Sequence, residues 1–187
     1  ASKDRAESYA RSLEEKGAER TQQLELLSRK DSLTDLYKQR SLYELLRRDL
    51  LKSKRSSESL SFVYFDVDKF KTVNDRFGHA AGDDILRMVG EIARQHIGRG
   101  HQIGRIGGEE FLVLMPDTSI SEAEKHVERL RVNIMNARLD NLGIGVTVSA
   151  GLADSDGIQS VKQMLLLADA ALYAAKDGGR NRLEIAA

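Results

Sequence analysis

The sequence has no cysteine among its 187 residues, which excludes disulfide bonds and thiolate metal sites. Its four histidines are scattered, and without cysteine partners they do not predict a structural zinc site. No apolar run approaches the length of a membrane-spanning helix, and no secretory signal is visible. We therefore expect a cytoplasmic chain that makes no membrane contact itself, although the parent protein can be membrane-attached.

An excess of charge of one sign is also lacking. Lys and Arg together number 29, as do Asp and Glu, so the net charge is zero. A protein that wraps a nucleic-acid polymer through bulk charge needs a basic excess, so we expect no such partner. A local basic site for a small phosphate ligand stays open. What the chain does have is 41% apolar residues, enough for the core of one domain with an appendage.

The appendage is the charged, proline-free segment 1–30, which predicts a helix from about residue 2 to residue 30. A heptad reading puts Ala6, Leu13, Arg20 and Leu27 at one seam position, and Ala10, Gly17 and Leu24 at the other. The ends fit a coiled coil and the middle does not. Two interpretations stay open, a solvated helix and the last turns of a signalling stalk that pairs two chains. Because the chain begins with Ala1 rather than Met, we expect it to be a fragment of a longer protein.

Residues 31–187 form the second expected unit, and apolar periodicity predicts its elements. Helices are expected at 40–53, 69–77, 83–97, 121–135 and 160–176, strands at 60–65, 101–106, 110–116, 146–154 and 180–186, and a loop at 52–59. Gly107 and Gly108 predict a tight hairpin, and Ser121 with Glu124 fits a capping box. This order is typical of an α/β (α+β) fold with a mostly antiparallel central sheet, flanking helices and a relation to the ferredoxin-like arrangement.

Acidic residues stand where the predicted strands end. Asp66 and Asp68 follow the strand at 60–65, and Glu109 and Glu110 lie at the hairpin tip. If the hairpin pairs with that strand, Asp66 and Glu109 come within reach of one cation. Clustered carboxylates repel one another, and Mg²⁺, which prefers oxygen ligands, removes that penalty. The glycines would then let a phosphate approach the backbone. The alternatives are a solvated hairpin tip and, for Asp66, a helix N-cap.

Other polar residues fit a nucleotide. Lys71 and Asn74 share a helix face, and Asn is unfavourable inside a helix unless its amide has a role. Asn74 and the carboxylate of Asp83 can together read the edge of guanine, although Asp83 can also cap the next helix. Lys176 and Arg180 bracket a glycine turn, where they can bind phosphate oxygens or favour the helix C-terminus.

Taken together, these residues resemble the GGDEF family of diguanylate cyclases, in its GGEEF variant, from Asp31 to Glu184. The resemblance rests on DSLTDL (31–36), FDVDKFKTVNDRFGHAAGDDIL (65–86), RIGGEEF (105–111), TVSAGLA (147–153) and ALYAAKDGGRN (171–181). It implies a palm-like fold and the condensation of two GTP into cyclic di-GMP with release of two pyrophosphates. The two half-sites would meet in a homodimer, and each 3′-hydroxyl would attack the other α-phosphorus in line.

The resemblance also implies roles for residues at matching positions. Asp66 and Glu109 would bind Mg²⁺ (or Mn²⁺) with the backbone carbonyl of Val67, and Glu110 would assist. Glu109 would also be the base for the 3′-hydroxyl, and Lys71 would stabilise charge on the phosphates.

The same comparison implies a substrate site. Lys176 and Arg180 would hold the β- and γ-phosphates, while Asn74 and Asp83 would read guanine. The pocket walls would be Leu33, Phe70 and His79.

Two departures from the family pattern matter. The inhibitory product site, Arg-x-x-Asp, falls on Gly98 to His101, so both of its defining residues are missing and we expect weak or absent product inhibition. At the junction with the first helix, Asp35, Lys38 and Gln39 replace the usual Gly, Asn and Arg, which bears on coupling between helix and domain.

Two other functions stay open beside the cyclase. One is a non-catalytic module that holds GTP as an allosteric ligand, and the other is a signalling dimerisation unit whose working part is the helix. A pure binder need not keep the metal acids, which argues against the first.

Overall fold

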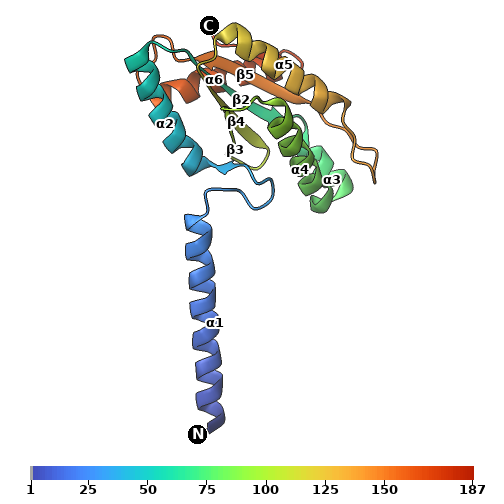
Figure 1. Ribbon diagram of the computed structural model, residues 1–187. Coiled ribbons are helices and arrows are strands. Elements are labelled where there is room, and N and C mark those ends of the chain that lie inside the picture. The colour runs from blue at the N-terminus through green and yellow to red at the C-terminus, as the bar shows by residue number, and fades with distance from the viewer. Residues whose placement is uncertain (1) are drawn as a thin grey trace.

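The computed structural model describes residues 2–187, except for the side chains of 2–7, 9, 10, 22 and 25–27. Helix α1 (Ser2–Leu27) stands away from the remaining chain (Figure 1). Of the heptad positions, the side chains of Ala6, Ala10 and Leu27 lie outside the described residues. Leu13 and Leu24 are 55% and 68% exposed in the single chain. No helix in the described part is both long and apolar enough to cross a membrane.

The domain is built on a six-stranded sheet with the order β1-β3-β4-β2-β5-β6. Its strands are β1 (Tyr37–Lys38), β2 (Leu60–Val67), β3 (Gln102–Arg105), β4 (Glu110–Pro116), β5 (Val148–Asp154) and β6 (Leu183–Ile185). The four central strands are antiparallel, whereas the edge strands β1 and β6 run parallel to their neighbours. The predicted fold class is therefore confirmed. Strand β1 was not predicted, because two residues are too short to show a pattern.

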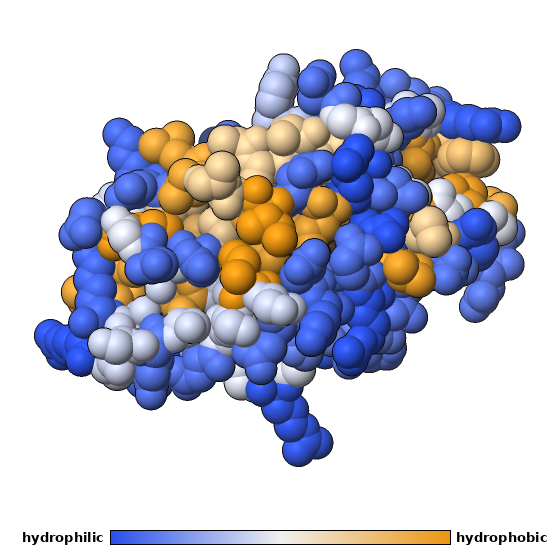
Figure 2. All heavy atoms as spheres, turned by 90° about the horizontal axis from the view of Figure 1, so that it is seen from above, coloured by the Kyte–Doolittle hydropathy of each residue, from blue (hydrophilic) through white to orange (hydrophobic). Residues whose placement is uncertain are grey.

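Helices cover both faces of this sheet (Figure 1). They are α2 (Gln39–Ser56), α3 (Phe70–Phe77), α4 (His79–His96), α5 (Ile120–Asn136) and α6 (Val161–Asp177). Helices α2 and α6 pack on the face that carries Phe62 and Leu112, and α4 and α5 on the face that carries Phe65 and Phe111. Side chains along β2 and β4 point alternately to the two faces, so each apolar run contributes to two cores. Seen from the end away from α1, apolar side chains gather centrally amid hydrophilic ones (Figure 2).

Several predicted boundaries are wrong. Helix α2 continues to Ser56, so most of the predicted loop at 52–59 is helical, and the left-handed Ser57 ends the helix. Strand β2 runs through Asp66 to Val67, because both its neighbours pair with it that far. Asp66 is consequently a strand residue and not an N-cap.

Two predicted helix starts are also wrong. The capping box of α5 is formed by Ser119 and Glu122, not by the equally spaced Ser121 and Glu124. Helix α4 begins at His79, because Gly78 with φ of 88° ends α3 and lets the next helix follow at once. Asp83 therefore lies inside α4, and the alternative that it caps this helix is wrong.

Candidate active site

The acidic residues come together where β2 and β4 end. Asp66 and Glu110 stand opposite each other in the antiparallel pairing, and the Val67 N–H donates to the Glu109 carbonyl at 3.2 Å. Because side chains alternate along a strand, Asp66 and Glu110 point to the face that α2 and α6 cover. The end of β2 and the start of β4 thus bring Asp66, Glu109 and Glu110 together at one end of these central strands.

The environment of Asp66 disfavours its negative charge. The residue is 6% exposed. Burial raises the pKa of the Asp66 carboxyl to about 6, and the nearby Glu109 and Glu110 add to this, although Lys176 opposes it. The Lys176 ammonium, in the last turn of α6, lies 3.0 Å from Asp66 Oδ2. One lysine therefore does not balance the carboxylates that converge here.

This donor set fits a hard divalent cation. Among the side chains that the structure describes, no three from His, Asp or Glu already form a group that could hold a metal. Mg²⁺ in nucleotide sites, however, takes one or two carboxylates together with phosphate oxygens of the substrate. The raised pKa of Asp66 and the ammonium drawn to it both mark a place where a cation is stabilised.

Asp68, two residues further on, has a different environment. It is 7% exposed, and it accepts hydrogen bonds from Thr147 Oγ1 (2.7 Å), Ser149 Oγ (2.6 Å) and the Asn181 N–H (3.0 Å). Its carboxylate is thus already engaged by three donors. In the sequence, Asp66 and Asp68 look alike; the structure separates a poorly neutralised acid from a fully engaged one.

The hairpin between β3 and β4 is confirmed, but its glycines are not there for a left-handed backbone. A Cβ on Gly107 would overlap the Glu110 carboxylate, whereas a Cβ on Gly108 would have no atom within 4 Å. Gly107 therefore makes room for an acidic side chain, and Gly108 leaves the outer side of the turn open. Only Gly108 fits the predicted approach of a phosphate.

The expected guanine-reading residues lie on the α3–α4 pair. Asn74 Oδ1 is buried and has no hydrogen-bond partner. A Cβ on Gly82 would overlap that atom and lie 3.1 Å from Phe70 Cζ, so the absence of a side chain at Gly82 makes room for the amide. Asp83 is the next residue along α4 and is exposed. Sequence reasoning missed Gly82, whose neighbour across the helix pair could not be read from spacing.

The other residues predicted to form the pocket walls or to contact phosphate differ in how far they are buried. Phe70 is buried at the start of α3, and Leu33 is half-buried against the same core. Lys71, on α3, and His79, the first residue of α4, are exposed. The structure gives the position of these four residues, and their roles in a nucleotide site stay predictions.

Two hollows flank the sheet at opposite ends. One of about 460 Å³ is lined in part by Lys69, Arg138 and Arg180, and thus adjoins the glycine turn after α6. A larger one, of about 600 Å³, is lined by residues such as Ser53 and Ser155 near the start of β2. The larger hollow lies at the other end of β2 from Asp66, and the lining of the smaller one includes Arg180 but neither Asp66 nor Glu109. Neither hollow by itself locates the site, which rests on the converging acidic side chains.

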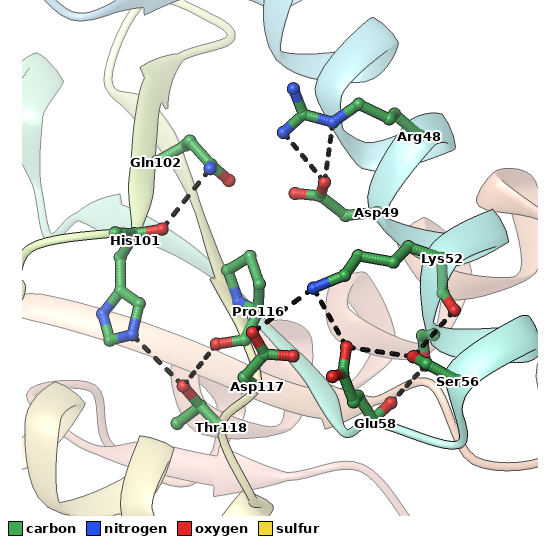
Figure 3. Close-up of polar contacts among 12 residues, drawn as sticks. Arg48, Asp49, Lys52, Ser56, Glu58, His101, Gln102, Pro116, Asp117 and Thr118 are labelled. Atoms are coloured by element: carbon green, nitrogen blue, oxygen red, sulfur yellow. Dashed lines mark hydrogen bonds and ion pairs between the residues drawn. The ribbon is translucent and has the colours of Figure 1, made fainter.

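His101, the residue at the position of the Asp in the expected product-site pattern, packs within the domain. His101 Nε2 lies 3.1 Å from Thr118 Oγ1 (Figure 3). The His101 ring meets the ring of His126 edge to face, with the ring centres 5.5 Å apart. Burial lowers the pKa of His101, and His126 adds to this. Nearby, Lys52 joins Glu58 and Asp117 in exposed ion pairs (Figure 3). A neutral imidazole in this setting does not replace the missing carboxylate.

Arg105 links the α1 junction to the acidic hairpin and was missed by sequence reasoning. Its Nη1 lies 3.2 Å from Asp31 Oδ1, while its Nε and Nη2 donate to the Gly108 carbonyl at 3.0 and 2.9 Å. Burial opposes the effect, but hydrogen bonds from Thr34 and the charge of Arg105 lower the pKa of Asp31. One guanidinium therefore holds the segment after α1 and the loop before Glu109 together.

A family profile described as diguanylate cyclase, GGDEF domain, matches residues 28–182. The chain is 37% identical to diguanylate cyclase DgcP of Pseudomonas aeruginosa over an alignment of 158 residues. This alignment covers 83% of this chain and 24% of DgcP. It is 34% identical over 158 residues to diguanylate cyclase DosC of Escherichia coli, which covers 83% of this chain and 34% of DosC. The chain thus spans a quarter to a third of these curated relatives.

Solved structures agree in fold. The coiled coil and GGDEF domain of DgcB from Caulobacter crescentus, in complex with c-di-GMP, matches with a TM-score of 0.81 at 27% identity, covering 100% of both chains. Diguanylate cyclase SiaD of Pseudomonas aeruginosa, in complex with its activator SiaC, matches with a TM-score of 0.81 at 35% identity, covering 97% of this chain and 72% of that one.

Proposed function

The chain belongs to the GGDEF family of diguanylate cyclases, and from this premise we propose that residues 31–187 condense two GTP molecules into cyclic di-GMP and two pyrophosphates. The observation that carries the proposal is the convergence of Asp66, Glu109 and Glu110 at one end of β2 and β4. Residues 1–30 would serve as a signalling helix that follows an upstream sensory domain in a cytoplasmic part of the parent protein.

The metal-binding residues would be Asp66 and Glu109, with the Val67 carbonyl at the end of β2 and assistance from Glu110. A bound Mg²⁺ or Mn²⁺ ion supplies charge stabilisation at the phosphate and favours the ionised 3′-hydroxyl. Lys176, 3.0 Å from Asp66 Oδ2, is then free to turn towards phosphate oxygens together with Arg180.

The chain's own groups would move the proton and orient the substrate. Glu109 would accept the proton of the attacking 3′-hydroxyl, since it is half-buried at the hairpin tip and close enough to Asp66 to affect its pKa. Lys71, exposed on α3, stabilises the negative charge that develops on the phosphates.

Base recognition would belong to α3 and α4. The unpartnered Oδ1 of Asn74 accepts a hydrogen bond from a guanine donor, and Asp83 accepts from the N1–H and the 2-amine. Leu33, Phe70 and His79 would form the walls. An adenine has no such pair of donors on this edge, so the site favours guanine.

Two copies are needed because each chain carries a single set of these groups. The 3′-hydroxyl that attacks must come from the GTP held by a second chain, so the active form is a homodimer. Exposed Leu13 and Leu24 on α1 are available for pairing two stalks.

The proposal is tested by Glu109→Gln, which keeps the shape and removes the charge and the base. We expect cyclic di-GMP formation to fall at least about a hundredfold, as for other lost acid–base or electrostatic groups. Glu124→Gln, on the exposed surface of α5, is the matched control and should be fully active. Near-normal turnover of folded Glu109→Gln would refute the assigned role.

A further inference from the structure

The turn after α6 has an unusual backbone. Gly179, Arg180 and Asn181 follow one another with φ of 114°, 66° and 46°. Glycine adopts such values freely and asparagine tolerates them, but for an arginine they are unfavourable. Residues in this region keep such a conformation only where surrounding contacts enforce it. Some part of the fold must therefore hold Arg180 in place.

Hydrogen bonds from α6, from α5 and from the end of β2 hold the turn. The Arg180 N–H donates to the Ala175 carbonyl at 3.0 Å, which closes the end of α6. The Asn181 N–H donates to Asp68 Oδ2 at 3.0 Å, across 113 positions of sequence. Arg131 Nη1, from α5, donates to Asn181 Oδ1 at 2.8 Å. Of these partners, only Asp68 belongs to the segment that carries Asp66.

Asp68 is itself fixed from two further sides. Thr147 Oγ1 donates to Oδ2 at 2.7 Å and Ser149 Oγ to Oδ1 at 2.6 Å, so both carboxylate oxygens are tied to the start of β5. Asp68 as a residue is only 7% exposed. With its two oxygens shared among three donors, it is poorly placed to bind a cation as well. Its role is to connect the end of β2 to the turn that carries Arg180.

We propose that Asp68 is a positioning residue for the triphosphate of the nucleotide. It holds Arg180 in the left-handed conformation that fixes the direction of its side chain relative to Asp66 and Lys176. When the Asn181 N–H loses its acceptor, the turn relaxes and Arg180 leaves the phosphate site. This inference rests on the proposed function, because it assumes that Arg180 binds the β- and γ-phosphates.

The test compares Asp68→Ala with Asp68→Asn. Alanine removes the acceptor of the Asn181 N–H. Asparagine keeps it, because its carbonyl can accept from Asn181 and Thr147 while its amide donates to the Ser149 hydroxyl. Ser149→Ala is the matched control, since it removes a bond to the same carboxylate without touching the turn.

Dissociation constants are measured for GMP and for an α,β-methylene analogue of GTP, which cannot be cleaved at the reacting bond. In Asp68→Ala we expect the constant for the triphosphate to rise at least about tenfold, as when a charge-assisted contact is lost, with that for GMP unchanged. Asp68→Asn and Ser149→Ala should resemble the unaltered chain in both. A merely structural role would instead change the two constants together, or only the melting temperature.

Further outcomes separate this inference from the proposed function. If the unaltered chain binds both nucleotides equally, Arg180 does not hold the β- and γ-phosphates. In that case this inference and the phosphate-binding role given to Arg180 in the proposed function are both wrong. If it prefers the triphosphate and folded Asp68→Ala keeps that preference, the positioning role alone is wrong. An Asp68→Asn variant as defective as the alanine would also overturn it, because charge would then be what matters. Should Asp68→Ala not fold, Arg131→Met releases the same turn from α5 and must weaken the triphosphate selectively for the proposal to stand.

Discussion

The close approach of Gly82 to Asn74 makes Gly82→Ala a sharp test of how guanine is read. A Cβ at this position would overlap Asn74 Oδ1 and lie 3.0 Å from Asn74 Cγ and 3.1 Å from Phe70 Cζ. The amide is the end of a short side chain and can rotate away more easily than α3 and α4 can separate. The substitution should therefore displace the amide and leave the fold in place.

The expected loss of affinity follows from one hydrogen bond. A neutral hydrogen bond contributes about 0.5–1.5 kcal/mol, and leaving a buried partner unsatisfied costs about 1–3 kcal/mol. Taking about 1–2 kcal/mol for the displaced amide, the dissociation constant for GTP should rise about five- to thirtyfold. Stability should change little, because alanine gains about 0.8–1.0 kcal/mol of helix propensity over glycine, against the cost of the crowded contact.

The assay is calorimetric titration with the uncleavable GTP analogue and its adenine counterpart, together with thermal unfolding. Gly90→Ala, in the same helix, is the control, because its nearest neighbours would be Thr34 Cβ at 3.3 Å and Leu36 Cδ1 at 3.5 Å. It should bind guanine nucleotide normally. If Gly82→Ala is folded and binds as tightly as the unaltered chain, Asn74 does not read the base. A large fall in melting temperature with unchanged affinity would mean that the helices moved instead.

Three further predictions concern other parts of the domain. Burial holds the pKa of Asp66 near 6, above its ordinary 3.8, so without metal this carboxyl favours folding below about pH 4 and loses that contribution as the pH rises through 6. Mg²⁺ should accordingly raise the melting temperature more at pH 7.5 than at pH 5.5, and equal shifts at both would contradict the site. Asp35 has a left-handed backbone with φ of 56° and an exposed ion pair to Arg94, so Asp35→Ala should lower the free energy of unfolding by about 1 kcal/mol, whereas Asp35→Gly should change it little. Urea titration measures both, and an alanine variant as stable as the original would refute this. Cyclic di-GMP should inhibit weakly or not at all, so low-micromolar inhibition that disappears in Arg99→Ala would show a working product site.

The sheet and most helices were predictable because their apolar patterns are long and consistent. The run 60–65 and its partner 110–116 each alternate between two cores, which is the strongest signal the sequence offers. Boundaries failed where two local solutions are equivalent. Ser119 with Glu122 and Ser121 with Glu124 have the same spacing, and only the path of the preceding loop selects the first.

The site was predictable as a set of residue types and not as a network. Spacing alone does not distinguish the roles of Asp66 and Asp68. What distinguishes them is that Asp68 is hydrogen-bonded by Thr147 and Ser149, which lie 79 and 81 positions further along the chain. Gly82 and Arg105 likewise act through partners that only the folded chain reveals. Long-range hydrogen bonds and close approaches leave no local trace in sequence.

The central claim is that two copies of this chain make cyclic di-GMP from GTP. The most direct measurement is incubation with GTP and Mg²⁺ at low and high protein concentration, with the nucleotides separated by chromatography. We predict that cyclic di-GMP forms and that its rate per chain rises with protein concentration, because two half-sites must meet. No cyclic di-GMP at any concentration, from a chain that still binds GTP, would contradict the account.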